Sequence, residues 1–467
     1  MATTRNHPNI GQTPTFIRTP DWPTMTSAFQ RFTNPTTASE ILRSCLPELA
    51  GDPREITGCR MQDARLKTFT KVASKIKSTM SVCYQLTVHT PSTSQSSHHL
   101  VYLKAYLHGR SAEVFLSLSR NRPADQTLDQ AVTHVPQYDA IIWRFPHDPA
   151  LPHLPHVINL QTIEQHLPLD GLNLMGMSGT PHVMASHVVN YRPETRCTNR
   201  YDLFDPSCGR AYRLFGKTFH GSEGQSLYTR LQHFWERSLI DPGAMAVAQP
   251  LGYAAPIKTV WQLGVPGVPL LQELTPSTYE PYVTELVRGL ASLHHSNVTG
   301  LQTHSVTDHL AEVRKKLTKL SDAIPSLTET CLAMADDLEH TAPPSSVIPC
   351  RPIHWDFHVQ QVLADKGRLV FCDLDELVYG DPVQDLANFI VDLHFHNLNE
   401  QFVERVARNL YHAYRRQVEW DVPVERVTWH ARLQFINKAY RHYLRFAPGF
   451  ERTVEQILAL AQKGFSL

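Results

Sequence analysis

The chain lacks several features that would narrow its function at once. Its 467 residues include 44 Lys and Arg against 44 Asp and Glu, so no net charge favours nucleic acid or an acidic membrane surface as a partner. No apolar run reaches the length of a membrane span, and the polar first residues lack the apolar stretch of a signal peptide. The eight cysteines form no CxxC pair. We therefore expect a cytoplasmic protein with reduced thiols that binds neither nucleic acid nor membrane.

The familiar glycine-rich phosphate loops are also absent, because neither GxGxxG nor GxxxxGK[ST] occurs in the β-rich part of the chain. The composition is that of an ordinary globular protein, with 42% hydrophobic and 19% charged residues. The length suffices for two or three domains with their own cores. Composition alone leaves the oligomeric state open.

The most informative stretch of the chain is a cluster of polar residues that begins at His354. The sequence HWDFHVQQ places His354 two residues before Asp356, and Gln361 five residues after it. A strand-like run, LVFC, then ends at Asp373, and Asp375 follows. A carboxylate at the end of a buried strand is costly unless it is paired or binds metal. A loop aspartate, a carboxamide and a strand-end aspartate in this order are the layout of a phosphoryl-transfer site.

Secondary-structure patterns divide the chain into a β-rich part and a helix-rich part. Strand-like segments dominate up to about residue 271, and helical periodicity dominates after residue 277. The clearest helical stripe recurs every four residues at Phe402, Val406, Leu410 and Tyr414. The pattern predicts an α+β fold with two lobes, in which the polar cluster lies in the second lobe.

The β-rich part contains an apparent internal repeat. CYQLTV (83–88) resembles RYDLFD (200–205), and LVYLKAYLHG (100–109) resembles AYRLFGKTFHG (211–221). Aligning the two His-Gly pairs places Lys104 within one position of Lys217, and a helix is expected after each copy. We interpret this as a duplicated β-rich unit. A chance resemblance between two hairpins is the alternative.

The polar cluster resembles the aminoglycoside phosphotransferase and choline kinase-like family, small-molecule kinases related to the protein kinases. The family's H-x-D-x-H-x-x-N loop corresponds to His354, Asp356, His358 and Gln361, and its metal segment to Asp373, Asp375, Gly380, Asp381, Pro382 and Asp385. The resemblance covers about residues 185–465. Gln361 departs from the family's asparagine and is one methylene longer, and Trp355 stands where a small residue or arginine is usual.

The resemblance implies a two-lobed, protein-kinase-like fold with an apparently duplicated β-rich N-lobe and a helical C-lobe. The expected units are a flexible tail (1–28), a first β-rich unit resembling a duplicated N-lobe (29–180), a nucleotide-binding N-lobe (181–270) and a helical lobe with the catalytic and acceptor sites (271–467). It also implies an ATP- or GTP-dependent kinase that uses Mg²⁺ and transfers the γ-phosphoryl group to a hydroxyl of a small molecule, such as a sugar or metabolite.

The resemblance assigns catalytic and metal-binding roles to the polar cluster. Asp356 would accept the hydrogen of the substrate hydroxyl, and His354 would brace the loop. Asp373, Gln361 and Asp375 would bind Mg²⁺, with Asp375 able instead to orient the loop. Asp385, which begins a helix, is expected to satisfy backbone N–H groups at that helix N-terminus.

Nucleotide phosphates would be bound from the β-rich lobe. Lys217 lies mid-strand among apolar neighbours and needs an anionic partner, whereas Lys104 is expected to be structural or a relic. Lys217 could also extend from an edge strand into solvent. The turn 191–197 would cover the phosphates with backbone amides and with Arg192 and Arg196. The family's acidic partner for the lysine is not assignable, because Glu223 is close to Lys217 in sequence and Glu236 is far from it.

Three other interpretations of the polar cluster compete with a kinase. A haloacid dehalogenase-type phosphatase would use the sequence DLDEL, but its second acidic cluster lies only eight residues away, which is too close for that fold. A metal hydrolase built on HWDFH lacks HExxH spacing. The remaining alternative is a catalytically degenerate kinase fold that binds a ligand or protein.

The charge of the C-terminal helices bears on the acceptor. Between residues 400 and 467 there are eleven Lys and Arg against seven Asp and Glu. A site for a polycationic aminoglycoside should be acidic. We therefore expect a neutral or anionic hydroxyl compound as acceptor.

Overall fold

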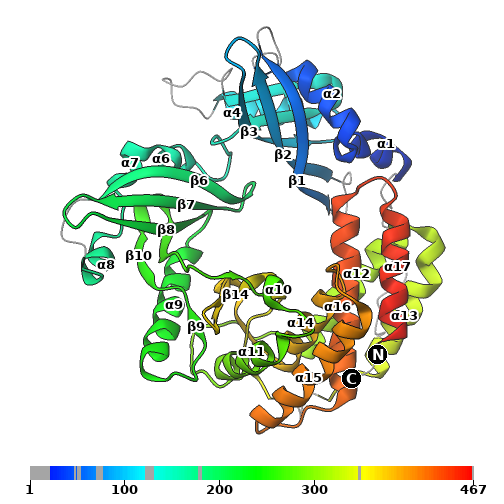
Figure 1. Ribbon diagram of the computed structural model, residues 1–467. Helices are drawn as coiled ribbons and strands as arrows, with labels where there is room; N and C mark the ends of the chain where they lie inside the picture. The colour runs from blue at the N-terminus through cyan, green and yellow to red at the C-terminus, as the bar shows by residue number, and fades with distance from the viewer. Residues whose placement is uncertain are drawn as a thin grey trace, which may run out of the picture.

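The computed structural model describes residues 22–46, 49, 54–69, 77–120, 131–176, 181–344 and 349–464. It has β-sheets in the amino-terminal part and mainly helices in the carboxy-terminal part (Figure 1). The expected α+β class and the order of the two parts are therefore confirmed. Within the described residues, every helix is too short or too polar to cross a membrane.

The first β-rich unit is a five-stranded antiparallel sheet with the strand order β1-β2-β3-β5-β4. Asn34 caps the second helix by accepting hydrogen bonds from Thr36 N and Thr37 N, and proline follows the cap, where its missing N–H costs nothing. The elements of this unit are α1 (Trp22–Thr33), α2 (Pro35–Cys45), β1 (Glu55–Phe69), β2 (Lys77–Thr90), β3 (Gln95–Ala105), α4 (Arg110–Arg120), β4 (Val132–Val135) and β5 (Ala140–Arg144).

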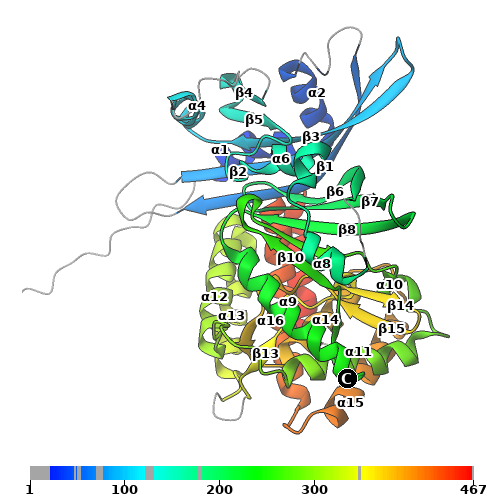
Figure 2. The ribbon, with the colours of Figure 1, turned by 90° about the vertical axis from the view of Figure 1, so that its left-hand side faces the viewer.

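The second β-rich unit repeats this architecture. Its sheet has the order β10-β11-β8-β7-β6, and the helix after its third strand packs on β10 and β11, as α4 packs on β4 and β5. Figure 2 shows the two sheets stacked above the helical part. The elements are β6 (His182–Arg192), β7 (Arg196–Asp205), β8 (Arg210–Phe219), α9 (Glu223–Ile240), β10 (Pro250–Ala254) and β11 (Thr259–Leu263).

The tail is shorter than expected. Residues 22–28, expected to be part of the tail, belong to α1, while residues 1–21 lie outside the described residues. The segment that connects the two sheets contains the short helices α6 (Leu154–Ile158), α7 (Leu160–Glu164) and α8 (Leu169–Leu174). Each of these helices contributes an apolar residue to the cluster of β7, β8 and β11, and Leu154 of α6 also shares a cluster with Tyr102 and Trp143 of the first sheet.

The helical part contains the small strands that carry the polar cluster. The stripe expected at 402–414 is buried along one face of α15. Its helices are α10 (Leu270–Glu273), α11 (Tyr279–His294), α12 (Val306–Ala323), α13 (Thr328–His340), α14 (Val383–Leu393), α15 (Glu400–Gln417), α16 (Val424–Arg445) and α17 (Phe450–Lys463). Its strands are β9 (Ala246–Val247), β12 (Val268–Pro269), β13 (Arg351–Ile353), β14 (Val362–Asp365), β15 (Arg368–Phe371) and β16 (Val378–Gly380). The short 3₁₀ helix η5 (Val359–Gln361) precedes β14, and η6 (Leu374–Glu376) follows β15.

The first unit also contacts the far end of the helical part, so the chain closes on itself (Figure 1). Thr33 Oγ1 at the end of α1 donates a hydrogen bond to the carbonyl oxygen of Phe446, at 2.8 Å. The edge of Trp22 packs on Tyr443, and β1 lies against α16. The apolar residues on the α1 and α2 side of the first sheet form one continuous core with those of the helical part.

Candidate functional site

The loop that carries Asp356 is held from behind by a buried aspartate on α14. Both carboxylate oxygens of Asp385 accept backbone hydrogen bonds, from His354 N at 2.6 Å and from Trp355 N at 3.0 Å. His294 Nε2 lies 3.2 Å from the same carboxylate. Trp355 has a φ of 74°, in the left-handed region, so these bonds stabilise an unfavourable backbone conformation. The sequence assigned Asp385 to N–H groups of its own helix; it binds those of the loop instead.

His354 ties the loop to the strand that leads to Asp373. The imidazole is fully buried, and its Nε2 lies 2.9 Å from the carbonyl oxygen of Cys372, to which it must donate a hydrogen bond. This contact matches the bracing role expected for His354. It fixes the distance between the loop and the end of β15, and hence between Asp356 and Asp373.

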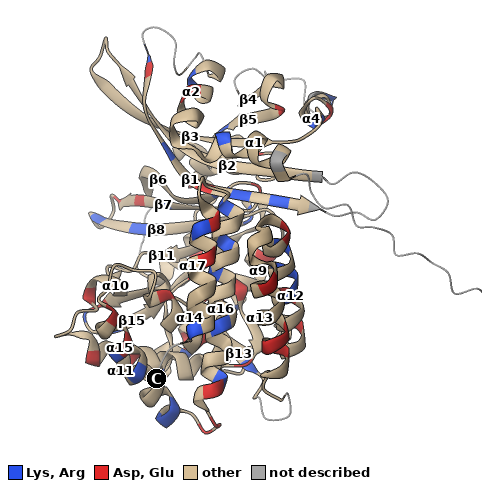
Figure 3. Ribbon diagram, turned by 90° about the vertical axis from the view of Figure 1, so that its right-hand side faces the viewer, with Lys and Arg blue, Asp and Glu red and all other residues tan. Residues whose placement is uncertain are grey.

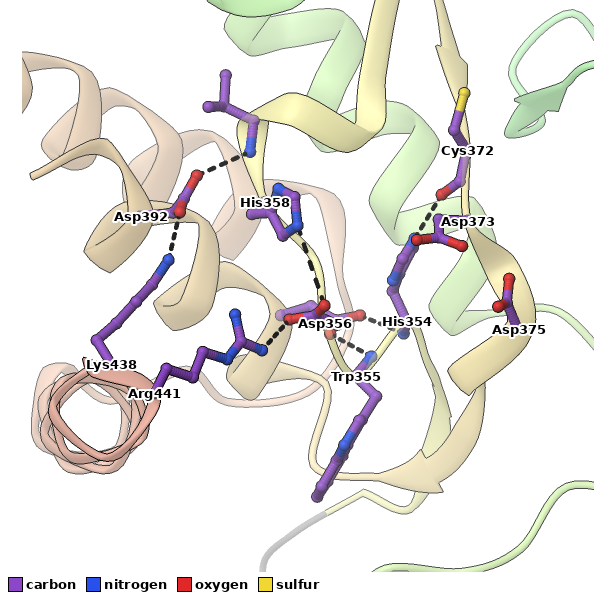
Figure 4. A network of polar contacts seen from close by, with 12 residues as sticks. His354, Trp355, Asp356, His358, Cys372, Asp373, Asp375, Asp392, Lys438 and Arg441 are labelled. Carbon is purple, nitrogen blue, oxygen red and sulfur yellow. Dashed lines mark hydrogen bonds and ion pairs between the residues drawn. The ribbon is translucent and has the colours of Figure 1, made fainter. Parts of the chain in front are cut away.

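Asp356 projects from this loop toward α16 (Figure 4). Its carboxylate accepts a hydrogen bond from the Arg441 guanidinium at 2.8 Å, and His358 Nε2 lies 4.0 Å from its other oxygen. Burial lowers the pKa of His358, which favours its neutral form. One helical turn before Arg441, Lys438 forms a 2.5 Å ion pair with Asp392, a carboxylate that also accepts a bond from the loop. Two α16 cations therefore border the loop.

Two carboxylates and two cations meet at the end of β15. Lys217 Nζ bonds both oxygens of Asp375, at 2.6 and 2.7 Å, and also Asp373. Arg196 pairs with Asp375 and lies 3.5 Å from Asp373. Burial would raise the pKa of Asp373, but Lys217 and Arg196 hold it below its usual range. Burial raises the pKa of Asp375, which is only 9% exposed against 30% for Asp373. Asp373 is therefore the more accessible carboxylate.

The expected nucleotide-binding residues thus lie partly together. Lys217 from β8 and Arg196 from β7 face the two aspartates, across the interface between the second sheet and the helical part. Arg192 lies at the other end of the turn and is exposed, and its carbonyl oxygen accepts a bond from Thr195 N that closes the turn. Arg192 therefore belongs to the same turn as Arg196, but its side chain is exposed.

Lys217 does not pair with Glu223 or Glu236, the two glutamates considered from the sequence. The ion pairs of Lys217 among the described residues are with Asp373 and Asp375, and neither Glu223 nor Glu236 forms one with it. The helix that follows Lys217, α9, instead presents Arg230, whose guanidinium donates to the carbonyl oxygen of Asp375 at 3.4 Å. Burial lowers the pKa of Arg230. Sequence reasoning missed this arginine because it searched only for an acidic residue.

The residues expected to bind Mg²⁺ fit that role chemically. Gln361 is buried, and its Oε1 has no hydrogen-bond partner among the described residues, so this oxygen is available as a ligand. Gln361 lies beside the end of β15, since its carbonyl oxygen accepts a bond from Cys372 N at 2.8 Å. Within the described residues, no group of three or more His, Cys, Asp and Glu could hold a metal ion. A nucleotide-bound Mg²⁺ needs only one or two protein oxygens besides phosphate and water.

Comparison with known proteins identifies the central part of the chain. Residues 225–422, which contain the loop, both aspartates and most of α9, match the model described as APH, phosphotransferase enzyme family. This part of the chain is therefore similar to the phosphotransferase enzyme family. The resemblance that the sequence suggested is confirmed, and the expected transferase class with it. The match begins after Lys217, so it includes neither that lysine nor Arg196.

Solved structures similar to this chain include three small-molecule kinases. The choline/ethanolamine kinase family protein of Mesorhizobium loti is 14% identical, covers 62% of this chain and 90% of its own, and gives a TM-score of 0.42. The aminoglycoside 2'-phosphotransferase-IIIa in its GDP complex is 13% identical, with coverages of 63% and 99% and a TM-score of 0.44. A glucosamine kinase complex is 15% identical, with coverages of 60% and 81% and a TM-score of 0.42. No curated protein matches the chain.

Proposed function

We propose that this chain is a small-molecule kinase, which transfers the γ-phosphoryl group of ATP or GTP to a hydroxyl. The observation that carries the proposal is the fixed relation between Asp356 and Asp373. Asp385 holds the loop of Asp356, and His354 connects that loop to the residue before Asp373. A kinase needs this relation, because the base and the metal-binding carboxylate must flank one phosphoryl group.

The proposed chemistry at Asp356 is the orientation of an acceptor hydroxyl. The carboxylate is partly exposed and its loop is rigidly held, so it can accept the hydroxyl hydrogen with little reorganisation. Mg²⁺, bound through Asp373 and Gln361, would neutralise charge on the phosphates. Asp375, which is more deeply buried and bonded to Lys217 through both oxygens, would mainly position that lysine.

Charge matching supports nucleotide binding at the end of β15. Asp373 and Asp375 are paired with Lys217 and Arg196 within the protein. A Mg²⁺-nucleotide carries both signs of charge, so its metal can replace the cations at the carboxylates while its phosphates pair with Lys217 and Arg196. The exchange leaves no charge uncompensated, which a buried site requires.

The cations on α16 support a neutral or anionic acceptor. Arg441 contacts Asp356 directly, and Lys438 lies one turn away. A polycationic acceptor approaching Asp356 would meet these positive charges, although Asp392 and Glu376 offset part of them. Figure 3 shows both signs of charge interspersed over the helical part. An acceptor hydroxyl carried by a sugar, or by a compound with a carboxylate or phosphate, fits this setting best.

Nucleotide binding tests the proposal first. Mg·ATP or Mg·GTP in large excess should raise the melting temperature, because a ligand that binds only the folded state stabilises it. Consumption of the nucleotide should then be screened against sugars, sugar acids, amino alcohols and aminoglycosides. A folded protein whose melting temperature responds to neither nucleotide is not a kinase.

A catalytically degenerate binding module is the second candidate. The specific observation in its favour is that Lys217, Arg196 and Arg441 all have carboxylate partners within the site. A protein that transfers no phosphoryl group could keep such a network for stability alone. Nucleotide binding without turnover of any acceptor would favour this candidate over a kinase.

A further inference from the structure

The two β-rich units correspond residue by residue at the end of their third strands. Tyr106 N, just after β3, donates to the carbonyl oxygen of Asp139 at 2.8 Å, and Phe219 N, at the end of β8, donates to that of Lys258 at 3.1 Å. Asp139 and Lys258 each end a short 3₁₀ turn before the next strand, and both have a left-handed backbone, with φ of 48° and 49°. The same unusual connection therefore occurs at the same place in both sheets.

This correspondence makes Lys104 the counterpart of Lys217. Each lysine lies two residues before the donor of that bond, on the third strand of its sheet. Lys104 is opposite Ser81 on β2, as Lys217 is opposite Thr198 on β7. The first unit therefore has a lysine at the position that, in the second unit, faces the proposed phosphate site.

The surroundings of the two lysines differ completely. Lys217 faces the aspartates of the helical part, whereas Lys104 Nζ bonds both carboxylate oxygens of Glu194, at 2.6 and 2.9 Å. The side chains of Lys104 and Glu194 are 18% and 20% exposed, so this pair is better shielded from solvent than most surface ion pairs. Glu194 belongs to the second unit and lies in the turn between β6 and β7.

That turn is the one expected to cover the nucleotide phosphates. Glu194 has a φ of 60°, and its backbone N donates to Asp148 Oδ2 at 2.8 Å. Asp148, which follows β5 of the first unit, also accepts a 2.6 Å bond from the hydroxyl of Tyr191 at the start of the turn. At the end of the turn, Arg196 pairs with the aspartates of the proposed metal site. The first unit thus holds the turn that carries Arg196.

The turn also occupies the face of the first sheet on which a nucleotide would otherwise lie. Tyr191 and Cys197 are buried in an apolar cluster that includes Tyr102 and Trp143 of the first sheet. Tyr102 precedes Lys104 by two residues on β3, so it lies on the same face of the strand. This packing covers the Lys104 side of the first sheet, which therefore cannot serve as a second nucleotide site.

We propose that Lys104 and Asp148 are positioning residues, which hold the β6–β7 turn over the nucleotide phosphates. The first unit is then a duplicate of the nucleotide-binding lobe whose lysine binds the neighbouring phosphate-covering turn in place of a phosphate. This inference rests on the proposed function. The surroundings of Lys67 on β1 support the inference. Burial lowers the pKa of Lys67, and the positive charges of Lys104 and Arg65 lower it further, whereas the carboxylate of Glu194 raises it. Glu194 of the second unit thus lies against a basic part of the first unit.

The test measures the dissociation constant of a non-hydrolysable Mg·ATP analogue by calorimetry, with the full chain. Lys104→Met should weaken binding up to about fivefold, the upper end of what such an ion pair contributes. Lys104→Arg should retain most of the affinity. Lys104→Glu should weaken binding further, and the exchanged pair Lys104→Glu with Glu194→Lys should restore it. Rescue by the exchanged charges would show that the ion pair itself is needed, and weaker binding at an unchanged melting temperature without nucleotide would show that its role is not merely structural.

Control variants separate this inference from folding and from the proposed function. Arg314→Met removes an exposed ion-paired cation from α12 and should leave binding unchanged, and melting temperatures without nucleotide report folding. Glu194→Gln removes the same ion pair by neutralising the carboxylate, and it replaces Lys104→Met in the test if that variant does not fold. If the wild-type protein binds nucleotide and both Lys104→Met and Glu194→Gln bind it equally well, the inference is overturned. If the wild type binds none, the proposed function itself is wrong.

Discussion

The guanidinium of Arg441 lies 2.8 Å from the carboxylate of Asp356, although the two residues are 85 positions apart in the chain. The contact places a C-terminal helix directly at the proposed base, so α16 helps to define what can reach Asp356. Arg441→Gln should raise the KM for an anionic acceptor about fivefold to tenfold, because it removes a positive charge beside Asp356 that such an acceptor would pair with. The affinity for nucleotide should not change. Arg445→Gln, one turn further along α16 and exposed, is the matched control. A change in nucleotide affinity alone would contradict this role.

Asp356→Asn separates chemistry from binding. The amide keeps the shape of the side chain and accepts hydrogen bonds, but it has neither the charge nor the basicity of the carboxylate. Turnover should fall by about two to four orders of magnitude, the usual contribution of a positioned general base. The calorimetric affinity for Mg·nucleotide should stay within about twofold, because the loop is held by Asp385 and not by Asp356 itself. Full activity of this variant would exclude Asp356 as the base.

Asp373→Asn should abolish the dependence of nucleotide binding on Mg²⁺. The substitution removes the more exposed of the two carboxylates and leaves Lys217 paired with Asp375. The measurement is nucleotide affinity with and without Mg²⁺. Asp365→Asn, at the end of the neighbouring strand β14, should have no effect on it.

Gln361 should share in this metal site through its unpartnered oxygen. Gln361→Asn shortens the side chain to the length usual in the family and should be tolerated or improve Mg²⁺ affinity. Gln361→Ala should weaken the Mg²⁺ dependence at least about tenfold, as expected for loss of one metal ligand. An unchanged Mg²⁺ titration for Gln361→Ala would show that the residue is not a ligand.

A buried histidine behind the loop should make stability depend on pH. His309 packs against Trp355 and His430, and burial lowers its pKa well below the ordinary value. An unfolded histidine titrates near pH 6.5, so the unfolded state binds more protons than the folded state below that pH. The free energy of unfolding should therefore be at its full value above about pH 6.5 and should decrease as the pH falls, by up to about 1.4 kcal/mol per pH unit, until the folded-state pKa is reached.

Urea denaturation between pH 5 and 8 tests this dependence. His309→Phe removes the titrating group while keeping a ring of similar size, so its stability should decrease less steeply below pH 6.5 than that of the wild type. His412→Phe, an exposed histidine on α15, should leave the slope unchanged. Equal slopes for wild type and His309→Phe would contradict the assignment.

The local motifs could be predicted from the sequence, but their distant partners could not. His354, Asp356 and Asp373 stand in a short, spaced pattern whose chemistry is evident from the residue types. Arg441 and Asp148 have no such pattern around them, and only the tertiary structure brings them to the site. The repeat of the β-rich unit was visible through a few similar residues on two of its strands. The common strand order becomes evident only in three dimensions.

Strand β1 shows why some elements escaped prediction. Among the side chains of β1 that the structure describes, the buried apolar ones are Ile56, Ala64 and Leu66, and the register shifts near Gly58 and Asp63 interrupt the alternation. A strand with bulges does not keep a period of two residues, which is the signal that sequence reasoning uses. The sequence did not indicate α1 for a different reason, since this short helix is stabilised by packing on α2 and β2 and by the contact of Thr33 with Phe446, which are tertiary interactions.

The closure of the chain has a consequence for the rate of the catalytic cycle. The first unit is attached to the second through Glu194 and to the helical part through Phe446, so it connects the two parts of the chain that carry the proposed nucleotide site. A kinase with two lobes joined only by a hinge can open by rotating one lobe away from the other. Here the same rotation has to detach one end of the first unit. The first unit would therefore slow the release of the product nucleotide, and not phosphoryl transfer.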